Sequence, residues 1–326
     1  MIRANKQISY LVAILLATVS LNCTKHSTNP PPTQPVPFHY KTENVVIVVI
    51  DGPRYTETWG DAAHTYIPKR YALLQQGVFC SSFYNNGKTS TVPGHTAIST
   101  GIYETIDNDG TQYPQKPSIF QNWLKASNAS SSKAWIITTK DKLEVLSDCT
   151  EPGWKGTYKP MTDCGVNGLG TGYRFDNETF LKVKETFTRD HPKLMLINFK
   201  QPDEAGHQGD SIRYLKGITD TDNYVDLIWQ AIQNDSIYKN KTTMIVTNDH
   251  GRHTAGHLDG FISHGDDCDG CRHIEMFAIG PDFKKNFISN VTYDQIDITA
   301  TVAELLYFDM PFAKGKIIED IFTQLK

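Results

Sequence analysis

The chain has 326 residues, of which 39% are hydrophobic and 21% are charged, and its formal net charge is −4. This composition is typical of a globular protein and excludes a largely disordered or membrane-embedded chain. Lys and Arg form no basic run that would hold a phosphate backbone, so we expect no nucleic-acid partner.

The N-terminus has the features of an export signal. Arg3 and Lys6 precede an apolar stretch from Ile8 to Leu21, which is short for a membrane span but has the length of a signal-peptide core. We therefore expect residues 1–23 to be a signal peptide and the protein to be exported, to the periplasm or the outer cell surface. The stretch ends at Cys23 in a sequence that resembles a bacterial lipoprotein cleavage site, which predicts lipidation and membrane attachment. A plain cleaved signal followed by a disordered leader is the alternative.

A Pro-rich linker over residues 24–38 follows, and one domain is expected over residues 39–326 because neither an internal repeat nor a second composition appears there. Strand-like and helix-like stretches alternate along this domain. The expected strands are Asn44 to Ile50, Ala134 to Thr138, Lys193 to Asn198, Thr243 to Thr247 and Met276 to Ile279. The expected helices are Ser118 to Lys125, Asn177 to Thr188, Tyr224 to Ile232 and Ile296 to Tyr307. Such alternation predicts an α/β fold with a mostly parallel central sheet and helices on both faces.

Export to an oxidising compartment makes disulfides plausible for the cysteines. Cys149 and Cys164 are expected to close one loop, and Cys268 and Cys271 are expected to form a small CxxC ring. A zinc site at the CxxC pair is the alternative, ranked lower because a second cysteine pair is lacking. Cys80 is left over in an apolar run and is expected to be a buried, inert thiol.

Polar residues follow three of the expected strands, at the positions where ligands collect in open α/β sheets. The first strand leads into Asp51, the third into a segment from Gln201 to His207, and the fourth into Asp249 and His250. Five of the 11 histidines lie between positions 250 and 273. An Asp at a strand end is often only a helix N-cap. Three strand ends that are followed by carboxylates or imidazoles at one sheet edge favour a metal site instead. Carboxylates with imidazoles suit zinc.

The segment from Thr91 to Gly101 is predicted to be a turn that opens into a short helix. Thr91 is expected at or near the helix N-terminus, where free backbone N–H groups and the helix dipole stabilise an alkoxide and attract an anion. On this segment alone, an ordinary N-cap threonine is the simpler interpretation.

Together these residues resemble the alkaline phosphatase superfamily. The resemblance rests on Asp51, the Thr-Val-Pro-Gly-His turn at 91–95, the Pro-Asp-x-x-Gly-His motif ending at His207, the Asp-His-Gly motif at 249–251 and the Ser-His-Gly motif at 263–265. Their order and relative placing match that family from Val45 to the last expected helix. The family's sandwich fold, an α/β sheet covered by helices, is therefore expected.

The resemblance implies two divalent metal ions, expected to be zinc. One metal would be held by Asp203, His207 and His264, and the other by Asp51, Asp249 and His250, with Thr91 bridging toward the second metal. It further implies that ionised Thr91 attacks phosphorus and forms a phosphothreonine intermediate.

His264 is the least certain of these ligands. His273 is its rival, whereas His253 and His257 follow Asp249 too closely in sequence to reach the other metal. His95 lies one helical turn past Thr91 and is expected to support the site or the packing rather than to bind metal.

Three further residues are candidates for binding the substrate phosphate. Lys140 and Lys142 resemble a Lys-x-Arg pair of one bacterial phosphomonoesterase branch, with lysine in place of arginine, and a solvated turn is the alternative. Asn108 matches the family's phosphate-binding asparagine, although an Asn-Asp-Gly turn would explain it equally well.

The expected activity is hydrolysis of a small phosphate monoester, because two cations favour the extra negative charge of a monoester over a diester. The main alternative is a phosphodiesterase or nucleotide pyrophosphatase of the same superfamily. A sulfatase is disfavoured because no Cys or Ser followed by Pro and Arg stands at the nucleophile position. A non-catalytic binding protein is disfavoured because no ligand is missing.

Overall fold

The structure is a computed structural model that describes residues 39–325. The predicted signal peptide (residues 1–23), the linker (24–38) and the lipidation of Cys23 lie outside the described residues and stay predictions. Within the described part of the chain, no helix has the length and apolar character needed to cross a membrane.

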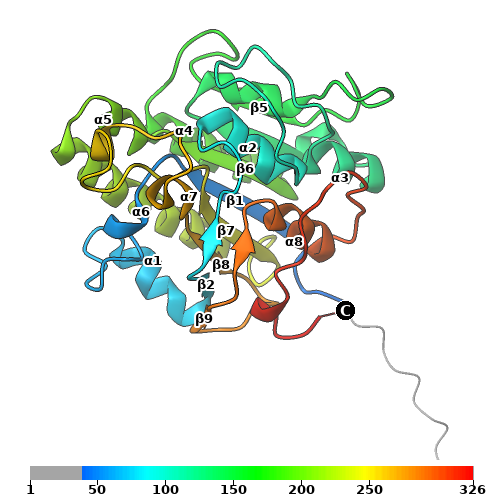
Figure 1. The fold of residues 1–326 in the computed structure, drawn as a ribbon. Helices are drawn as coiled ribbons and strands as arrows, with labels where there is room; N and C mark the ends of the chain where they lie inside the picture. The colour runs from blue at the N-terminus through cyan, green and yellow to red at the C-terminus, as the bar shows by residue number, and fades with distance from the viewer. Residues whose placement is uncertain (1–38, 326) are drawn as a thin grey trace, which may run out of the picture. The chain divides into compact units, whose positions relative to one another are not determined.

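An eight-stranded sheet stands at the centre of the fold, with the strand order β5-β4-β6-β1-β7-β8-β2-β9 (Figure 1). Its strands are β1 (Asn44–Ile50), β2 (Val78–Cys80), β4 (Ala134–Thr138), β5 (Met161–Cys164), β6 (Leu194–Phe199), β7 (Thr242–Asn248), β8 (Met276–Ile279) and β9 (Phe287–Ser289). The five strands from β5 to β7 are parallel, whereas β8 runs antiparallel to β7 and β2. A small second sheet pairs β3 (Phe83–Tyr84) with β10 (Tyr293–Asp294).

Two groups of helices cover the two faces of the sheet. The helices are α1 (Pro68–Leu73), α2 (Thr91–Thr100), α3 (Ile119–Ser127), α4 (Asp176–Asp190), α5 (Asp203–His207), α6 (Ser211–Asn234), α7 (Asp269–Arg272) and α8 (Asp297–Leu305). Val46 and Val48 of β1 share a core cluster with Val225 of α6 and Val183 of α4. The alternate residues of β1 point to the opposite face, and α2, α3 and α8 pack against one another as a separate group. The predicted α/β fold with a mostly parallel sheet is confirmed.

The five expected strands are present with bounds that differ by at most one residue, because each is a continuous buried β-branched or apolar run. The helix expected at Tyr224 to Ile232 is only the last part of the longer helix α6. Five short strands were not expected, namely β2, β5 and β9 of the central sheet and both strands of the second sheet, β3 and β10. Cys80 lies in β2 and is buried, and burial raises the pKa of its thiol, which agrees with the predicted inert role.

The cysteine pairing expected from the sequence is not what the structure shows. Cys149, Cys164, Cys268 and Cys271 are all free thiols. Cys164 ends β5, and its thiol donates a weak hydrogen bond to the backbone carbonyl of Ile136 in the neighbouring strand β4. The pairing of β5 with β4, which the sequence did not predict, therefore turns this thiol toward the sheet.

A buried charge cluster joins helix α1 to the rest of the core. The Arg70 guanidinium is fully buried, donates to Asp222 of α6 at 3.0 Å and also contacts Glu275, which precedes β8. Burial raises the pKa of Glu275, so the carboxylate depends on Arg70 to remain charged. Removing one member of such a group leaves uncompensated charge in the core.

We expect Arg70→Met to lower the free energy of unfolding by about 3 to 5 kcal/mol, because two buried carboxylates would lose their shared cation. Urea denaturation measures this change. Lys216→Met is the matched control, since Lys216 pairs with Asp220 on the exposed side of α6 and such pairs contribute about 1 kcal/mol or less. Equal losses in the two variants would contradict the assigned role of the buried cluster.

Candidate metal centre

The register of the parallel strands brings the strand ends that are followed by polar residues to one edge of the sheet. Ile50 of β1 lies opposite Phe199 of β6 and Asn248 of β7. Asp51 and Asp249 therefore follow neighbouring strands at the same level, and β4 ends beside them because Thr138 pairs with Asn198. The edge at which these four strands end is called the site edge below.

Asp51, Asp249 and His250 form the first cluster at the site edge. The His250 Nε2 atom lies 3.6 Å from Asp51 Oδ1 and 3.5 Å from Asp249 Oδ2, and all three side chains are completely buried. Each of these three atoms lacks a hydrogen-bond partner. Buried polar atoms normally have partners, so three converging lone pairs without a donor fit a bound cation.

The orientation of His250 is set by its other ring nitrogen. His250 Nδ1 lies 2.8 Å from the backbone carbonyl of Gly251, which can only accept, so Nδ1 carries the proton and Nε2 presents a lone pair. Burial lowers the pKa of His250 to about 3, which keeps the ring neutral and able to bind a metal. The same arrangement recurs at His264, whose Nδ1 lies 2.8 Å from the carbonyl of Thr89.

Asp203, His207 and His264 form the second cluster. Asp203 and His207 stand one turn apart on α5, and His207 Nε2 lies 3.3 Å from Asp203 Oδ1. His264 Nε2 lies 3.1 Å from His207 Nε2 and 3.4 Å from Asp203 Oδ1. The His264 ring also stacks on His250 at 3.7 Å, and Asp203, His250 and His264 again offer converging ligand atoms. The two clusters therefore adjoin along His250.

Thr91 is the first residue of α2, and Ser90 is the helix N-cap. The alternative that Thr91 serves as the cap is therefore wrong. Its hydroxyl oxygen instead accepts a hydrogen bond of 3.1 Å from Lys140 Nζ. Gly94 allows the first turn of α2 to approach this closely, because a Cβ at Gly94 would lie 2.4 Å from the backbone oxygen of Asp249.

Lys140 lies between the clusters and contacts both. Its ammonium donates to Asp203 Oδ2 at 2.7 Å and lies 2.9 Å from Asp51 Oδ2. Burial opposes the charge of Lys140, but the two carboxylates raise the pKa of its ammonium above the ordinary value. Burial also opposes ionisation of Asp203, yet Lys140 and the neighbouring histidines hold the pKa of this carboxyl well below its usual range.

The pKa of Asp51 moves in the opposite direction. Burial and the nearby Asp249 carboxylate raise it well above its usual range, even though Lys140 partly offsets them. One lysine therefore does not compensate all the carboxylates of the site edge. Additional positive charge, such as metal ions would supply, is needed to keep them all ionised.

Asn108 and Lys142 line the same cleft as Thr91. Asn108 Oδ1 accepts from the backbone N–H of Val92 at 2.8 Å, and Lys142 Nζ donates to the backbone oxygen of Asn108 at 2.8 Å. Burial, and secondarily Lys140, lowers the pKa of Lys142 to about 8. With Thr91 and Lys140, these two residues line one cleft of about 250 Å³. The alternative of a solvated turn is wrong for both lysines.

The remaining histidines discussed above do not belong to the two clusters. His273 stacks on Tyr55 at 3.7 Å and lies 3.0 Å from the carbonyl of Ser81, so it is not the third ligand of a metal here. His95 is buried, with Nδ1 2.8 Å from the Thr91 carbonyl and 3.4 Å from Asp249 Oδ2, which agrees with a supporting role. His253 and His257 belong to a different cluster.

Sequence reasoning missed two residues of the site. Arg252 is completely buried and its guanidinium contacts Asp203 and the carbonyls of the 261–262 turn. It directly follows the Asp-His-Gly motif, but nothing in the local sequence distinguishes a buried arginine from an exposed one. Tyr173 lines the cleft from the long loop before α4, whose path the sequence did not predict.

A family model described as the metalloenzyme superfamily matches residues 61–309 of this chain. Among curated proteins, GPI ethanolamine phosphate transferase 1 of Saccharomyces cerevisiae is 21% identical over 262 residues, which cover 74% of this chain and 27% of that protein. The chain thus spans about a quarter of the length of this curated relative.

Three solved structures share the fold at low sequence identity. The phosphonate monoester hydrolase of Silicibacter pomeroyi has a TM-score of 0.64 at 14% identity and covers 87% of this chain and 77% of its own. Murine ectonucleotide pyrophosphatase/phosphodiesterase 5 has a TM-score of 0.61 at 16% identity and covers 86% and 100%. An alkaline phosphatase superfamily protein of Vibrio parahaemolyticus has a TM-score of 0.63 at 14% identity and covers 86% and 70%.

Proposed function

Because this chain belongs to the alkaline-phosphatase-like metalloenzyme superfamily, we propose that it hydrolyses small phosphate monoesters with two divalent metal ions and Thr91 as the nucleophile. The observation that supports this most directly is the position of Thr91. Its hydroxyl lies at the start of α2 and within hydrogen-bonding distance of Lys140, which itself contacts both carboxylate–imidazole clusters.

The two clusters would hold the metals, one by Asp203, His207 and His264 and the other by Asp51, Asp249 and His250. Their oxygen and nitrogen ligands suit zinc. When bound, such ions stabilise negative charge that develops on the attacking and leaving oxygens of an in-line displacement. The partnerless lone pairs of the first cluster favour this assignment.

Two neighbouring features would favour Thr91 as the nucleophile. The N-terminus of α2 and the Lys140 ammonium both stabilise negative charge on the Thr91 oxygen. The Thr91 hydroxyl gives up its proton to solvent and its oxygen attacks phosphorus, forming a new oxygen–phosphorus bond. The leaving-group oxygen departs with the electron pair of the broken bond and takes up a proton from water. Water then cleaves the phosphothreonine and releases phosphate. The role assigned to Lys140 is to donate a hydrogen bond to the Thr91 oxygen, as its ammonium does at 3.1 Å.

Lys142 and Asn108 supply the features that favour a monoester. Lys142 is hydrogen-bonded to Asn108 and lines the cleft beside Thr91. A second ammonium at this place complements the extra negative charge that distinguishes a phosphate monoester from a diester. Tyr173 offers an aromatic surface to the leaving group at the cleft.

We expect p-nitrophenyl phosphate to be cleaved with a higher kcat/KM than bis-p-nitrophenyl phosphate by the metal-loaded protein, because the bound metal ions and Lys142 would add positive charge near Thr91. Steady-state kinetics on the two substrates measures the ratio. Lys142→Met is expected to lower this ratio about tenfold, the loss of one charge-assisted hydrogen bond. Lys125→Met on α3 is the matched control, since Lys125 packs over Trp154 away from the cleft. A faster reaction with the diester would contradict the proposed ester class.

A phosphodiesterase is the second candidate, favoured by the names of the similar proteins. The murine neighbour is a nucleotide pyrophosphatase/phosphodiesterase, and its inactive threonine-to-alanine variant has been solved in complex with AMP. The same pair of substrates decides between the two candidates. An inactive threonine variant in that fold also supports Thr91 as the residue to test first.

A further inference from the structure

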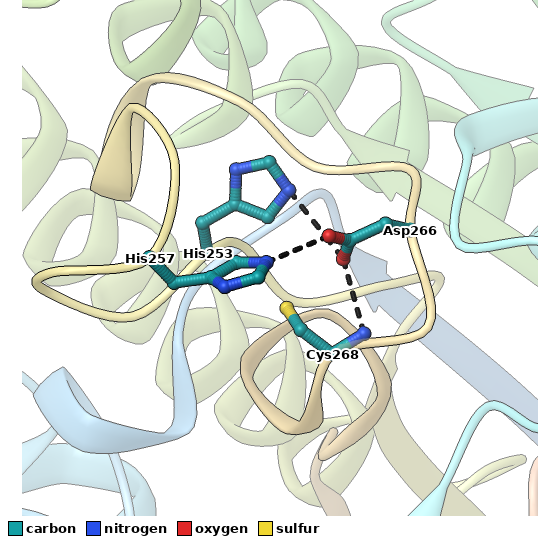
Figure 2. Close-up of side chains that lie close together, drawn as sticks. All are labelled: His253, His257, Asp266 and Cys268. Atoms are coloured by element: carbon teal, nitrogen blue, oxygen red, sulfur yellow. Dashed lines mark hydrogen bonds and ion pairs between the residues drawn. The ribbon is translucent and has the colours of Figure 1, made fainter.

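A separate cluster of metal-binding side chains lies in the long loop between β7 and β8. His253, His257, Asp266 and Cys268 each offer one ligand atom, and these atoms lie within 4.8 Å of one another. Figure 2 shows the four side chains gathered around the Asp266 carboxylate. None of them belongs to the two clusters at the site edge.

The His253 ring is oriented as a metal ligand would be. Its Nδ1 atom lies 2.8 Å from the Asp259 carboxylate, which only accepts when ionised, so Nδ1 carries a proton. The other nitrogen, Nε2, is buried and has no hydrogen-bond partner, and His253 as a residue is 4% exposed. The nearest charged atom is Asp266 Oδ1, at 3.5 Å. A carboxylate behind one ring nitrogen and a free lone pair on the other is the arrangement of ligating histidines.

The other three residues surround the same point. His257 Nε2 lies 2.7 Å from Asp266 Oδ2, and the backbone N–H of Cys268 donates to Asp266 Oδ1 at 3.0 Å (Figure 2). These two contacts hold the carboxylate next to both imidazoles. Cys268 is a free thiol, as is its buried neighbour Cys271. The His-x-x-x-His spacing of His253 and His257 is common in structural zinc sites.

We propose that His253, His257, Asp266 and Cys268 bind a third metal ion, zinc, which holds the β7–β8 loop in place. Two imidazoles, a carboxylate and a thiolate form a four-ligand set of the kind that closes a tetrahedral structural zinc site. Binding would displace the proton of the Cys268 thiol and the hydrogen bond between His257 and Asp266.

The position of the loop explains what such an ion would achieve. The backbone carbonyl of Asp266 accepts from Thr89 Oγ1 at 2.8 Å, and the Thr89 carbonyl orients His264. Thr89 stands two residues before Thr91. A metal bound at Asp266 would therefore stabilise the segment that positions both His264 and the start of α2, without contacting the substrate cleft.

Cobalt(II) substitution tests this site, because cobalt bound to a thiolate has a near-ultraviolet charge-transfer band and the clusters at the site edge contain no cysteine. The purified, reduced full chain is loaded with cobalt and dialysed, and its spectrum and metal content are measured. We expect the band in the unmodified protein. Cys268→Ser should abolish it and remove about one ion per chain, and His257→Ala, a second variant with the thiol intact, should also remove about one ion.

Cys149→Ser is the matched control, since Cys149 is also a free buried thiol but lies in a different loop, and it should keep both the band and the metal content. Two results overturn the proposal: an unmodified protein without the band, or metal content unchanged in both Cys268→Ser and His257→Ala. The readout is independent of hydrolysis, so a chain that lacks phosphatase activity but has the Cys268-dependent band retains the third site. A protein that hydrolyses the phosphate ester but lacks the band contradicts only the proposal of the third metal site.

Discussion

Replacing Thr91 by alanine is expected to lower kcat for p-nitrophenyl phosphate by roughly 10⁴-fold or more, a loss comparable to removal of the nucleophile from other hydrolases that form covalent intermediates. The hydroxyl is the group in the cleft that stands at a helix N-terminus and accepts from Lys140. Without it, the cleft lacks the attacking oxygen whose negative charge the N-terminus of α2 and the Lys140 ammonium would stabilise. Acid-quenched turnover followed by peptide mass spectrometry should place one phosphoryl group on Thr91 in the unmodified protein.

Two controls separate a chemical role of Thr91 from a structural one. Thr91→Ser keeps a hydroxyl at the same place and should retain measurable turnover and a trapped phosphoryl group. Thr100→Ala, at the other end of α2, removes a buried hydroxyl that donates to the carbonyl of Thr96 and accepts from the backbone N–H of Ile102, and should leave kcat nearly unchanged. A Thr91→Ala protein that is folded and turns over within tenfold of the original would exclude the phosphothreonine route.

Removal of divalent metals by a chelator is expected to reduce hydrolysis by about 10²-fold or more, and added zinc should restore it. The reason is electrostatic: Asp51, Asp249 and His250 direct partnerless buried atoms at one point, and metal ions in such sites contribute several kcal/mol to transition-state stabilisation. Metal analysis alongside the activity assay shows whether the two losses occur together.

Asp249→Asn examines the same site without a chelator. It keeps the shape of the side chain but removes the charge that faces His250, so metal content should fall by at least one ion per chain. Asp141→Asn is the matched control, because Asp141 is also buried near the end of β4 but uses its carboxylate to accept from the backbone of Gly172. Full activity in the metal-free protein would refute the two-metal mechanism.

The agreement between the predicted and observed site edge has a simple physical origin. Asp51 and Asp249 directly follow continuous buried runs, and parallel strands in register end at the same level. Once each run is recognised as a strand, the residue after it is placed to within a few ångströms of its neighbours. Asp203 and His207 come slightly later, on the short helix α5 that begins a few residues after β6, with one helical turn between them.

Side chains that approach the site from elsewhere were harder to assign. Lys140 was expected to bind the substrate phosphate, which stays a prediction, and the structure shows that it contacts Asp51, Asp203 and Thr91. The sequence around Lys140 is equally typical of an exposed turn. Only the burial of Lys140, which is 3% exposed, distinguishes a site residue from a residue of such a turn. Arg252 was not predicted to be a site residue, because its burial depends on a loop that folds back over it.

The sequence by itself determined five strands of the central sheet and the polar residues that follow them, because buried runs and strand-end motifs are local patterns. Only the tertiary structure decided which loop residues meet. It grouped His253 and His257 with Asp266 and Cys268, left Cys149 and Cys164 unpaired, and joined Asn108 to Lys142. These contacts join residues of loops that have no regular periodicity, so their partners are chosen by packing and by the pairing needs of buried polar groups.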